Sequence, residues 1–142
     1  MSETENKALL QRWVEEGWNQ RKGLDILEEV FSPDICIESD DVDYRGYDAL
    51  RQFINMMLTG FPDLHNALDI LLAEGDKVIS RHTLSGTHQG EFMGLAPTDK
   101  KVKFTALFIG QVADGRIVEG WQNANFYGLL QQLGAIPPVG DE

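Results

Sequence analysis

Residues 73–134 carry the pattern that most constrains how this chain can fold. Three stretches rich in β-forming residues, at 77–88, 102–112 and 116–125, are separated by a long connection and a tight turn, and a short helical stretch follows at 126–133. Successive side chains of a strand point to opposite faces, so long strands joined in this way favour an antiparallel sheet with one buried face. The C-terminal half of the chain is therefore predicted to be a sheet closed by a helix.

The N-terminal half adds helices and shorter strands to this sheet. Apolar residues recur at three- and four-residue steps, which predicts amphipathic helices. Gly75-Asp76 and Asp114-Gly115 have the composition of hairpin turns. The order of elements predicts an α+β fold, with N-terminal helices packed on the concave face of a curved, mostly antiparallel sheet. The expected helices are 4–21, 24–31 and 47–60, and the expected further strands are 35–37, 44–46 and 64–74.

Length and charge restrict the domain count and the classes of partner. A chain of 142 residues has the size of one domain, so residues 1–142 are expected to form a single domain with frayed ends at 1–4 and 136–142. The net charge of −11 argues against nucleic acids and anionic membranes, whose binding depends on clustered Lys and Arg. We therefore expect neither partner.

The expected compartment is the cytoplasm. No apolar run approaches the roughly 20 residues of a transmembrane helix, and the N-terminus lacks the basic and apolar regions of a secretory signal. The one cysteine, Cys36, lies in an apolar run and cannot form an internal disulfide, which fits a reducing environment.

The sequence predicts no metal site. The acidic run at 38–43 could offer carboxylate oxygens to a hard cation, but it lacks the glycine and the distal glutamate of an EF-hand loop. The three histidines do not have the spacing of metal ligands. The acidic run is therefore expected to be a solvated loop.

Polar residues within the last strand suggest a small-molecule pocket. A buried polar group without a partner costs roughly 1–3 kcal/mol, so a sheet that carries such groups usually has a use for them. Glu119, Trp121, Asn123 and Asn125 share one face because they are two residues apart. Trp121 offers a plane for stacking and Asn125 can donate a hydrogen bond to a carbonyl or enolate oxygen. This face is predicted to form a wall of the pocket.

Four residues outside that face are further candidates. Gln111 ends the neighbouring strand, and antiparallel pairing places it near residues 117–119. Arg81 and His82 are adjacent and cannot both point into the pocket; His82 could instead lie on the surface or at an interface. His88 lies in the loop between two strands, where it could stabilise a turn or take part in catalysis.

Helical residues supply the remaining candidate ligand contacts. Trp18 belongs to the apolar stripe of the first helix, and Phe53 and Met57 face inward from the third. Asn55 lies beside that inward face and could also look into a cavity.

A series of short segments that covers most of the chain matches a known family. The segments are Trp18-Asn19, Phe61-Pro62-Asp63-Leu64, Glu74-Gly75-Asp76-Lys77-Val78 with Arg81, Ser85-Gly86-Thr87-His88-Gln89-Gly90, Gly94-Leu95-Ala96-Pro97-Thr98, Lys101-Val102, Asp114-Gly115-Arg116-Ile117-Val118-Glu119 with Trp121, and Gln131-Gln132-Leu133-Gly134. In this order and spacing, the chain resembles the SnoaL-like polyketide cyclases of the NTF2-like superfamily. The resemblance implies a cone-shaped α+β barrel with a deep pocket, a homodimer in most cases, and cofactor-free ring closure of a hydrophobic polyketide-like ester by aldol condensation.

The resemblance also implies roles for particular positions. In this family an aspartate four residues after the signature Trp acts as general acid and base; that position here is Asn125, and Gln111 stands where some cyclases have histidine. An amide cannot exchange a proton near neutral pH. One hypothesis is an enzyme in which Asn125 and Gln111 hold the oxygen and His82 or Glu119 supplies the proton. The alternatives are a binding module that has lost the acid, and an interaction protein that uses the outer face of the sheet.

Overall fold

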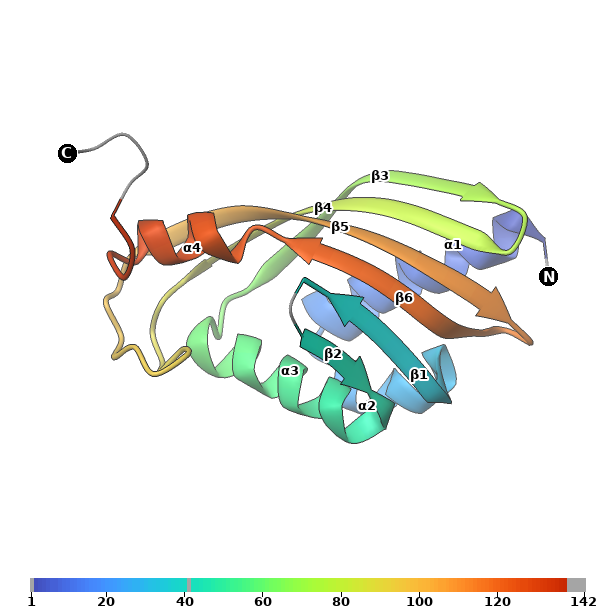
Figure 1. Cartoon of the computed structure of the whole chain (residues 1–142), viewed down its shortest axis with the longest axis horizontal. Helices are drawn as coiled ribbons and strands as arrows, with labels where there is room; N and C mark the ends of the chain where they lie inside the picture. The colour runs from blue at the N-terminus through green and yellow to red at the C-terminus, as the bar shows by residue number, and fades with distance from the viewer. Residues whose placement is uncertain (1, 41, 138–142) are drawn as a thin grey trace.

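A curved, six-stranded sheet forms the centre of the computed structural model, which describes residues 2–40 and 42–137. The strands lie in the order β2-β1-β6-β5-β4-β3, and the sheet is not closed into a barrel (Figure 1). The β1–β6 pair is parallel and the other pairs are antiparallel, which confirms the expected mostly antiparallel α+β fold. The bounds are β1 (Phe31–Ser39), β2 (Val42–Arg45), β3 (His65–Glu74), β4 (Lys77–Thr87), β5 (Lys101–Ala113) and β6 (Arg116–Ala124).

The first helical segment changes its winding before it ends. It begins as α1 (Glu3–Arg12) and continues as the π-helical η1 (Trp13–Asn19). Ser2 and Glu5 form a capping box, because the Ser2 side chain accepts from the Glu5 backbone N–H and the Glu5 carboxylate accepts from the Ser2 backbone. Residues 2–4, expected to be frayed, therefore form a capped helix start; residues 1 and 138–142 lie outside the described part.

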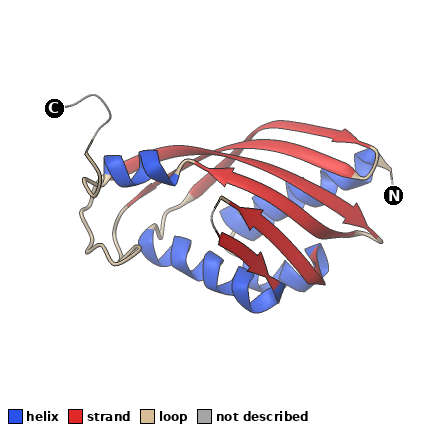
Figure 2. Ribbon diagram, in the orientation of Figure 1, coloured by secondary structure: helices blue, strands red, loops and turns tan. Residues whose placement is uncertain are grey.

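The other helices pack so that the first three cover one side of the sheet. They are α2 (Gly23–Val30), α3 (Gly46–Gly60) and α4 (Phe126–Gln132). Figure 2 shows α1, α2 and α3 along one side of the strands and α4 at the end of β6. The buried core between these layers contains aromatic and aliphatic side chains from every helix and most strands. Among the described residues, no helix is long and apolar enough to cross a membrane.

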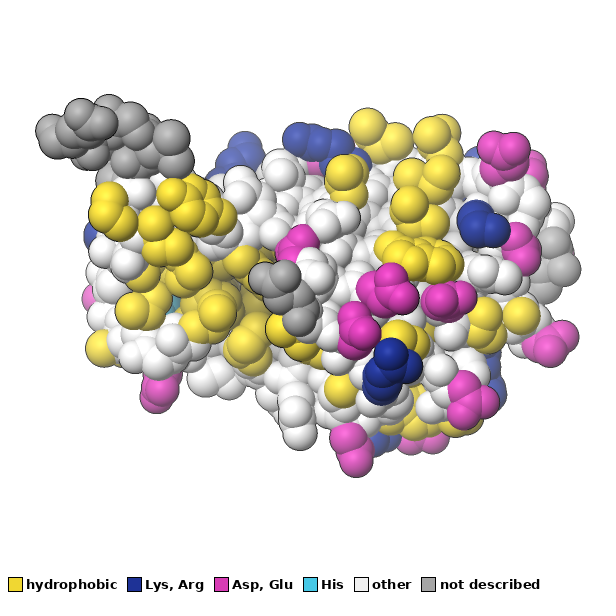
Figure 3. Space-filling view, viewed as in Figure 1, with side chains coloured by type: hydrophobic (Ala, Val, Ile, Leu, Met, Phe, Trp, Pro, Cys, Tyr) yellow, Lys and Arg dark blue, Asp and Glu magenta, His cyan; other side chains and the backbone are white. Residues whose placement is uncertain are grey.

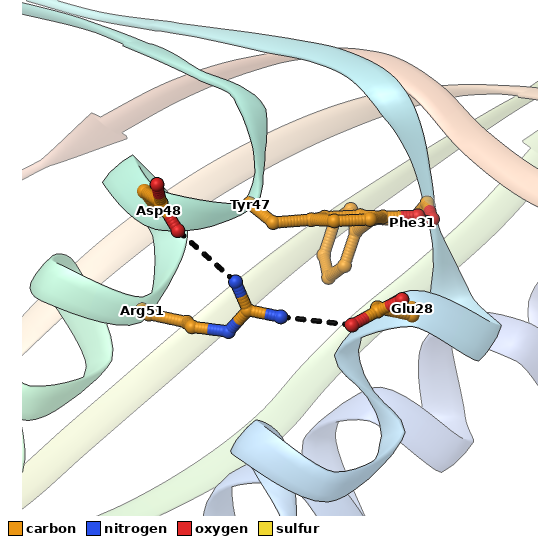
Figure 4. Close-up of polar contacts among 5 residues, drawn as sticks. All are labelled: Glu28, Phe31, Tyr47, Asp48 and Arg51. Atoms are coloured by element: carbon orange, nitrogen blue, oxygen red, sulfur yellow. Dashed lines mark hydrogen bonds and ion pairs between the residues drawn. The ribbon is translucent and has the colours of Figure 1, made fainter.

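Polar contacts fix α3 against α2 and the start of β1 (Figure 4). Arg51 lies between two carboxylates, at 3.1 Å from Asp48 and 2.8 Å from Glu28, and its guanidinium is 5.7 Å from the centre of the Tyr47 ring. The Tyr47 hydroxyl donates to the Phe31 carbonyl oxygen at 2.8 Å. These contacts orient the inner face of α3 towards the sheet.

Tight turns set the register of the long strands. Asp114 and Gly115, between β5 and β6, both have positive φ, at 51° and 79°, as a two-residue hairpin turn of type I′ requires. The turns predicted at Gly75-Asp76 and at Asp114-Gly115 are both present. Gln111 pairs with Glu119, as expected. The register determines which residues of β4, β5 and β6 face the helices.

Candidate functional site

A cavity lies between the concave face of the sheet and the helices. Its free space is about 90 Å³, which is room for several water molecules or a small organic group, since one water needs about 10–15 Å³. The lining is mainly aliphatic and aromatic, with polar side chains at Asn66, His82 and Gln122. Of the described residues, those that line the cavity include no Asp, Glu, Lys or Arg. The cavity therefore suits an uncharged, largely apolar ligand.

Small side chains leave this space open over the middle of the sheet. Ala106 of β5 pairs in register with His82 of β4 on one side and with Ala124 of β6 on the other, and all three line the cavity. Phe104 and Phe108, two residues before and after Ala106, also line it. Because neighbouring strands lie about 4.8 Å apart, the two alanines leave a gap extending roughly 10 Å from His82 across the sheet.

His82 is bonded through both ring nitrogens. Its Nδ1 lies 3.0 Å from Asn66 Oδ1 and its Nε2 lies 2.7 Å from Ser80 Oγ, while only 6% of the residue is exposed. An amide oxygen only accepts hydrogen bonds, so these partners assign the hydrogen to Nδ1 and the lone pair to Nε2, where the Ser80 hydroxyl donates. The network thus selects one tautomer of the neutral ring.

Burial determines the protonation state of this histidine. It lowers the pKa of His82 to about 4, and the Asp69 carboxylate acts weakly in the opposite direction. Desolvation disfavours the charged imidazolium, so the ring is neutral at physiological pH and has a lone pair that can accept a proton. A neutral imidazole can accept a proton on Nε2, and the lowered pKa makes it a weaker base than a free histidine side chain.

The π-helical segment joins the helical wall of the cavity to this polar cluster. Trp13, Val14 and Trp18 of η1 line the cavity, and Asn19 ends the segment. The Asn19 side chain donates to the Asn66 carbonyl oxygen at 2.9 Å and accepts from the Asn66 backbone N–H at 2.8 Å. Asn19 therefore fixes the backbone of the residue that orients the His82 ring.

Comparison with known proteins identifies the family. The family model for SnoaL-like polyketide cyclases matches residues 8–133. The chain belongs to the SnoaL-like polyketide cyclase family. No match to a curated protein was found.

Solved structures support the same assignment. AclR of Streptomyces galilaeus, a candidate hydroxylase, is 35% identical with a TM-score of 0.88 over 99% of this chain and 87% of its own. A candidate SnoaL-like polyketide cyclase from Jannaschia sp. CCS1 is 25% identical with a TM-score of 0.86, covering 96% of this chain and 95% of that one. IdmH of Streptomyces antibioticus, a candidate polyketide cyclase, is 29% identical with a TM-score of 0.79, covering 91% and 98%.

Four of the predicted site residues of this SnoaL-like chain lie at the cavity. Trp18 lines it from η1, Phe53 and Met57 line it from α3, and His82 lines it from β4. Arg81 points to the opposite face of β4, where its guanidinium lies 3.0 Å from Asp69. The prediction that Arg81 and His82 occupy different faces is therefore confirmed, and His82 is the one that faces the cavity.

The face of β6 that was predicted as a pocket wall does not line this cavity. Asn123 and Asn125 lie instead, with Arg81, around a second hollow on the outer side of the sheet. The residues of β6 that line the cavity are Gln122 and Ala124, so Glu119, Trp121 and Asn123 lie on the other face. Phe108 determines which face of β6 points towards the helices. Its ring packs closely over Gly110 and Gly120, and a Cβ atom would lie 2.9 Å from the ring at Gly110 and 2.7 Å from it at Gly120. Gly120 therefore faces inward together with Gln122 and Ala124, and the large Trp121 faces outward.

Asn125 and Gln111 are not brought together either. Asn125 is exposed and caps α4, since its Oδ1 accepts from the Gly128 backbone N–H at 2.9 Å. The backbone N–H of Asn125 donates to the Thr105 carbonyl oxygen on β5. Gln111 lies six residues beyond Thr105 on the same strand, roughly 20 Å from it. Gln111 donates to Asp76 at the hairpin end, at 3.3 Å.

The two remaining predicted residues lie outside the cavity lining. Asn55 is exposed on α3. His88 is fully buried, and its Nδ1 lies 3.0 Å from Thr98 Oγ1 and 3.3 Å from the Thr98 backbone nitrogen, which fits the turn-stabilising alternative.

Asn66 and Gln122 are site residues that the strand pattern did not single out. Gly110 and Gly120 carried a usable signal, because glycine inside a strand often marks the close approach of another group. Gly120 predicts that its own face of β6 is the packed inner one, and that face includes Gln122. Asn66 follows a loop at the very start of β3, where no such signal exists.

Proposed function

We propose that this protein binds an uncharged, hydrophobic carbonyl compound in the cavity and catalyses a cofactor-free aldol-type cyclisation or isomerisation. The observation that carries the proposal is a neutral histidine, His82, in the wall of an apolar cavity that also contains two amide side chains. The names of the Jannaschia protein and IdmH as candidate polyketide cyclases agree with this reaction class.

His82 exchanges the proton in this proposal. The Nε2 lone pair, which accepts from the Ser80 hydroxyl in this structure, takes a proton from the carbon next to a carbonyl group, and the electron pair of that C–H bond moves onto the carbonyl oxygen as an enolate. The amide N–H groups of Gln122 or Asn66 stabilise the oxygen as its charge develops. The enolate carbon then bonds to a second carbonyl carbon of the same molecule, and the resulting alkoxide takes the proton from His82. Isomerisation uses the same first step and returns the proton to another atom.

A second candidate function is binding without conversion. Both ring nitrogens of His82 already have protein partners, and Asn125 replaces the aspartate that the family resemblance implies. A protein of this kind would hold and protect its ligand.

Product analysis separates these functions. The purified protein is incubated with a neutral ketone ester of polyketide type, and the ligand is followed by mass spectrometry and by quenching of Trp13 and Trp18 fluorescence. A product of unchanged mass with a new retention time indicates cyclisation or isomerisation. A product that has lost one water molecule indicates condensation with dehydration. Recovery of a tightly bound but unchanged ligand indicates the binding function. Gain of one oxygen atom would refute the proposal and favour the hydroxylase activity suggested by the name of AclR.

We also propose that the protein forms a homodimer through the outer face of the sheet. Figure 3 shows hydrophobic side chains gathered over β3, β4 and β5. Five large apolar residues of these strands are between 38% and 57% exposed, which is an unusual concentration for a free surface. They are Ile70, Leu72, Ile79, Leu107 and Ile109.

A further inference from the structure

Ser80 is a buried hydroxyl group that the proposed reaction does not use. It is 0% exposed on β4, two residues before His82, and its Oγ is 2.7 Å from His82 Nε2. With Asn66 on the other ring nitrogen, the three side chains have the order of a nucleophile, base and orienting group. Ser80 is not one of the residues that line the cavity, however, so it is not placed to attack a bound carbonyl group.

The Ser80 hydroxyl group can donate its hydrogen bond to either of two acceptors. One is the lone pair of His82 Nε2, and the other is the carbonyl oxygen of Phe108 on β5, which lies 3.4 Å from Oγ. A hydroxyl group rotates to suit its partners, and its oxygen can accept a hydrogen bond while its hydrogen is donated elsewhere. The same heavy-atom positions therefore allow two hydrogen-bond patterns.

We propose that Ser80 is a positioning residue that keeps the His82 ring hydrogen-bonded in both of its protonation states. In the neutral state, Ser80 donates to Nε2. When Nε2 gains a proton, the new N–H donates to Ser80 Oγ, and the hydroxyl hydrogen turns to the Phe108 carbonyl oxygen. The proton stays on Nε2 until the ring returns to its neutral state, so no atom is gained or lost.

Asn66 completes this arrangement from the other side of the ring. Its Oδ1 accepts from Nδ1–H in the neutral and in the charged state, and Asn19 holds its backbone through two hydrogen bonds. Asn66 thus keeps the ring in place while the bond to Ser80 reverses. Each polar atom of the Ser80–His82–Asn66 cluster named here has a partner in both states, so proton uptake requires no movement of the backbone.

This inference rests on the proposed function for its purpose, but its test needs no substrate. Ligand-free protein labelled with ¹⁵N in its histidine rings is titrated by NMR from pH 7 to pH 4, as wild type, Ser80→Ala and Ser85→Ala. Ser85 lies on the same strand outside the cavity lining and is the matched control. Ser80→Cys, which keeps a weak donor, replaces Ser80→Ala should that variant fail to fold.

Ser80→Ala should release the Nε2 lone pair and weaken proton binding. The Nε2 resonance should move to the position of an unbonded base nitrogen, and the pKa of His82 should fall by about one unit, since a hydrogen bond to a charged group is the stronger one. At pH 4 the ring should be about half protonated in the wild type and about one-tenth protonated in the variant. Ser85→Ala should match the wild type.

Unchanged Nε2 resonance and unchanged protonation in Ser80→Ala would overturn the inference. That result leaves the proposed reaction standing, whereas absence of turnover by the wild type would refute the reaction and leave the NMR result intact. With a turned-over ketone, Ser80→Ala should lower kcat and retain KM, because Ser80 lies outside the cavity lining. A raised KM with unchanged kcat would contradict the positioning role.

Discussion

Replacing His82 by glutamine should change how the free energy of unfolding depends on pH. In the folded chain, burial lowers the pKa of His82 to about 4, whereas an unfolded chain has a histidine pKa near 6.5. Between these values the unfolded state binds more protons, so stability falls as the pH falls. The stability linked to His82 is fully present above about pH 6.5 and is lost down to about pH 4.

These two pKa values give the expected size of the effect. Going from pH 7 to pH 4.5 should cost the wild type about 2 kcal/mol through His82 alone. His82→Gln lacks this titration, so its loss over the same range should be smaller by that amount. Asn55→Ala, on the exposed surface of α3, removes no titrating group; it is the control and should follow the wild type.

Urea unfolding at the two pH values, followed by circular dichroism, measures this difference directly. Other groups also titrate in this range, but they are common to all three proteins and cancel in the comparison. Equal losses in the wild type and His82→Gln would show that the ring titrates normally in the folded state. The assignment of His82 as a buried neutral base would then be refuted.

Three further predictions concern other parts of the molecule. Asn19→Ala should lower the free energy of unfolding by about 1–3 kcal/mol in urea titrations, because it leaves the backbone groups of Asn66 without their partners. Ala106→Leu should fill the gap beside His82 and weaken ligand binding at least tenfold by tryptophan fluorescence, while Leu107→Ala on the opposite face should not. Leu107→Lys should convert a dimer into a monomer by light scattering coupled to gel filtration, whereas Leu24→Lys on the surface of α2 should leave the mass unchanged.

The elements of this fold could largely be predicted from the sequence, because their signals are local. Turn residues such as Asp114-Gly115 and the periodicity of 47–60 depend on neighbouring residues alone, and the structure places a turn and α3 there. The first helix was expected to run regularly over 4–21, but it becomes π-helical from Trp13 and ends at Asn19. Its change of winding depends on packing that a periodic pattern does not describe.

The face of β6 shows where the sequence was misleading. Its alternation separates two sets of residues but does not say which set faces the helices. The large Trp121 and the asparagines made one set look like a pocket wall. The contact of Phe108 with Gly120 instead places the other set on the face that packs against the helices. That contact joins two strands and is not visible in either strand alone. His82 was identified as a candidate because it is a polar residue within a largely apolar strand, and its burial became known only from the fold.

Deuterium exchange at a bound ketone measures proton transfer by His82 without a need for the complete reaction. The protein is incubated in D₂O with β-tetralone, a neutral bicyclic ketone, and NMR follows deuterium entering the carbon next to the carbonyl group. We expect the wild type to accelerate this exchange above the buffer rate, His82→Gln to abolish the acceleration, and Asn123→Ala on the outer face to retain it. Equal rates in the wild type and His82→Gln would contradict the assignment of His82 as the group that exchanges the proton.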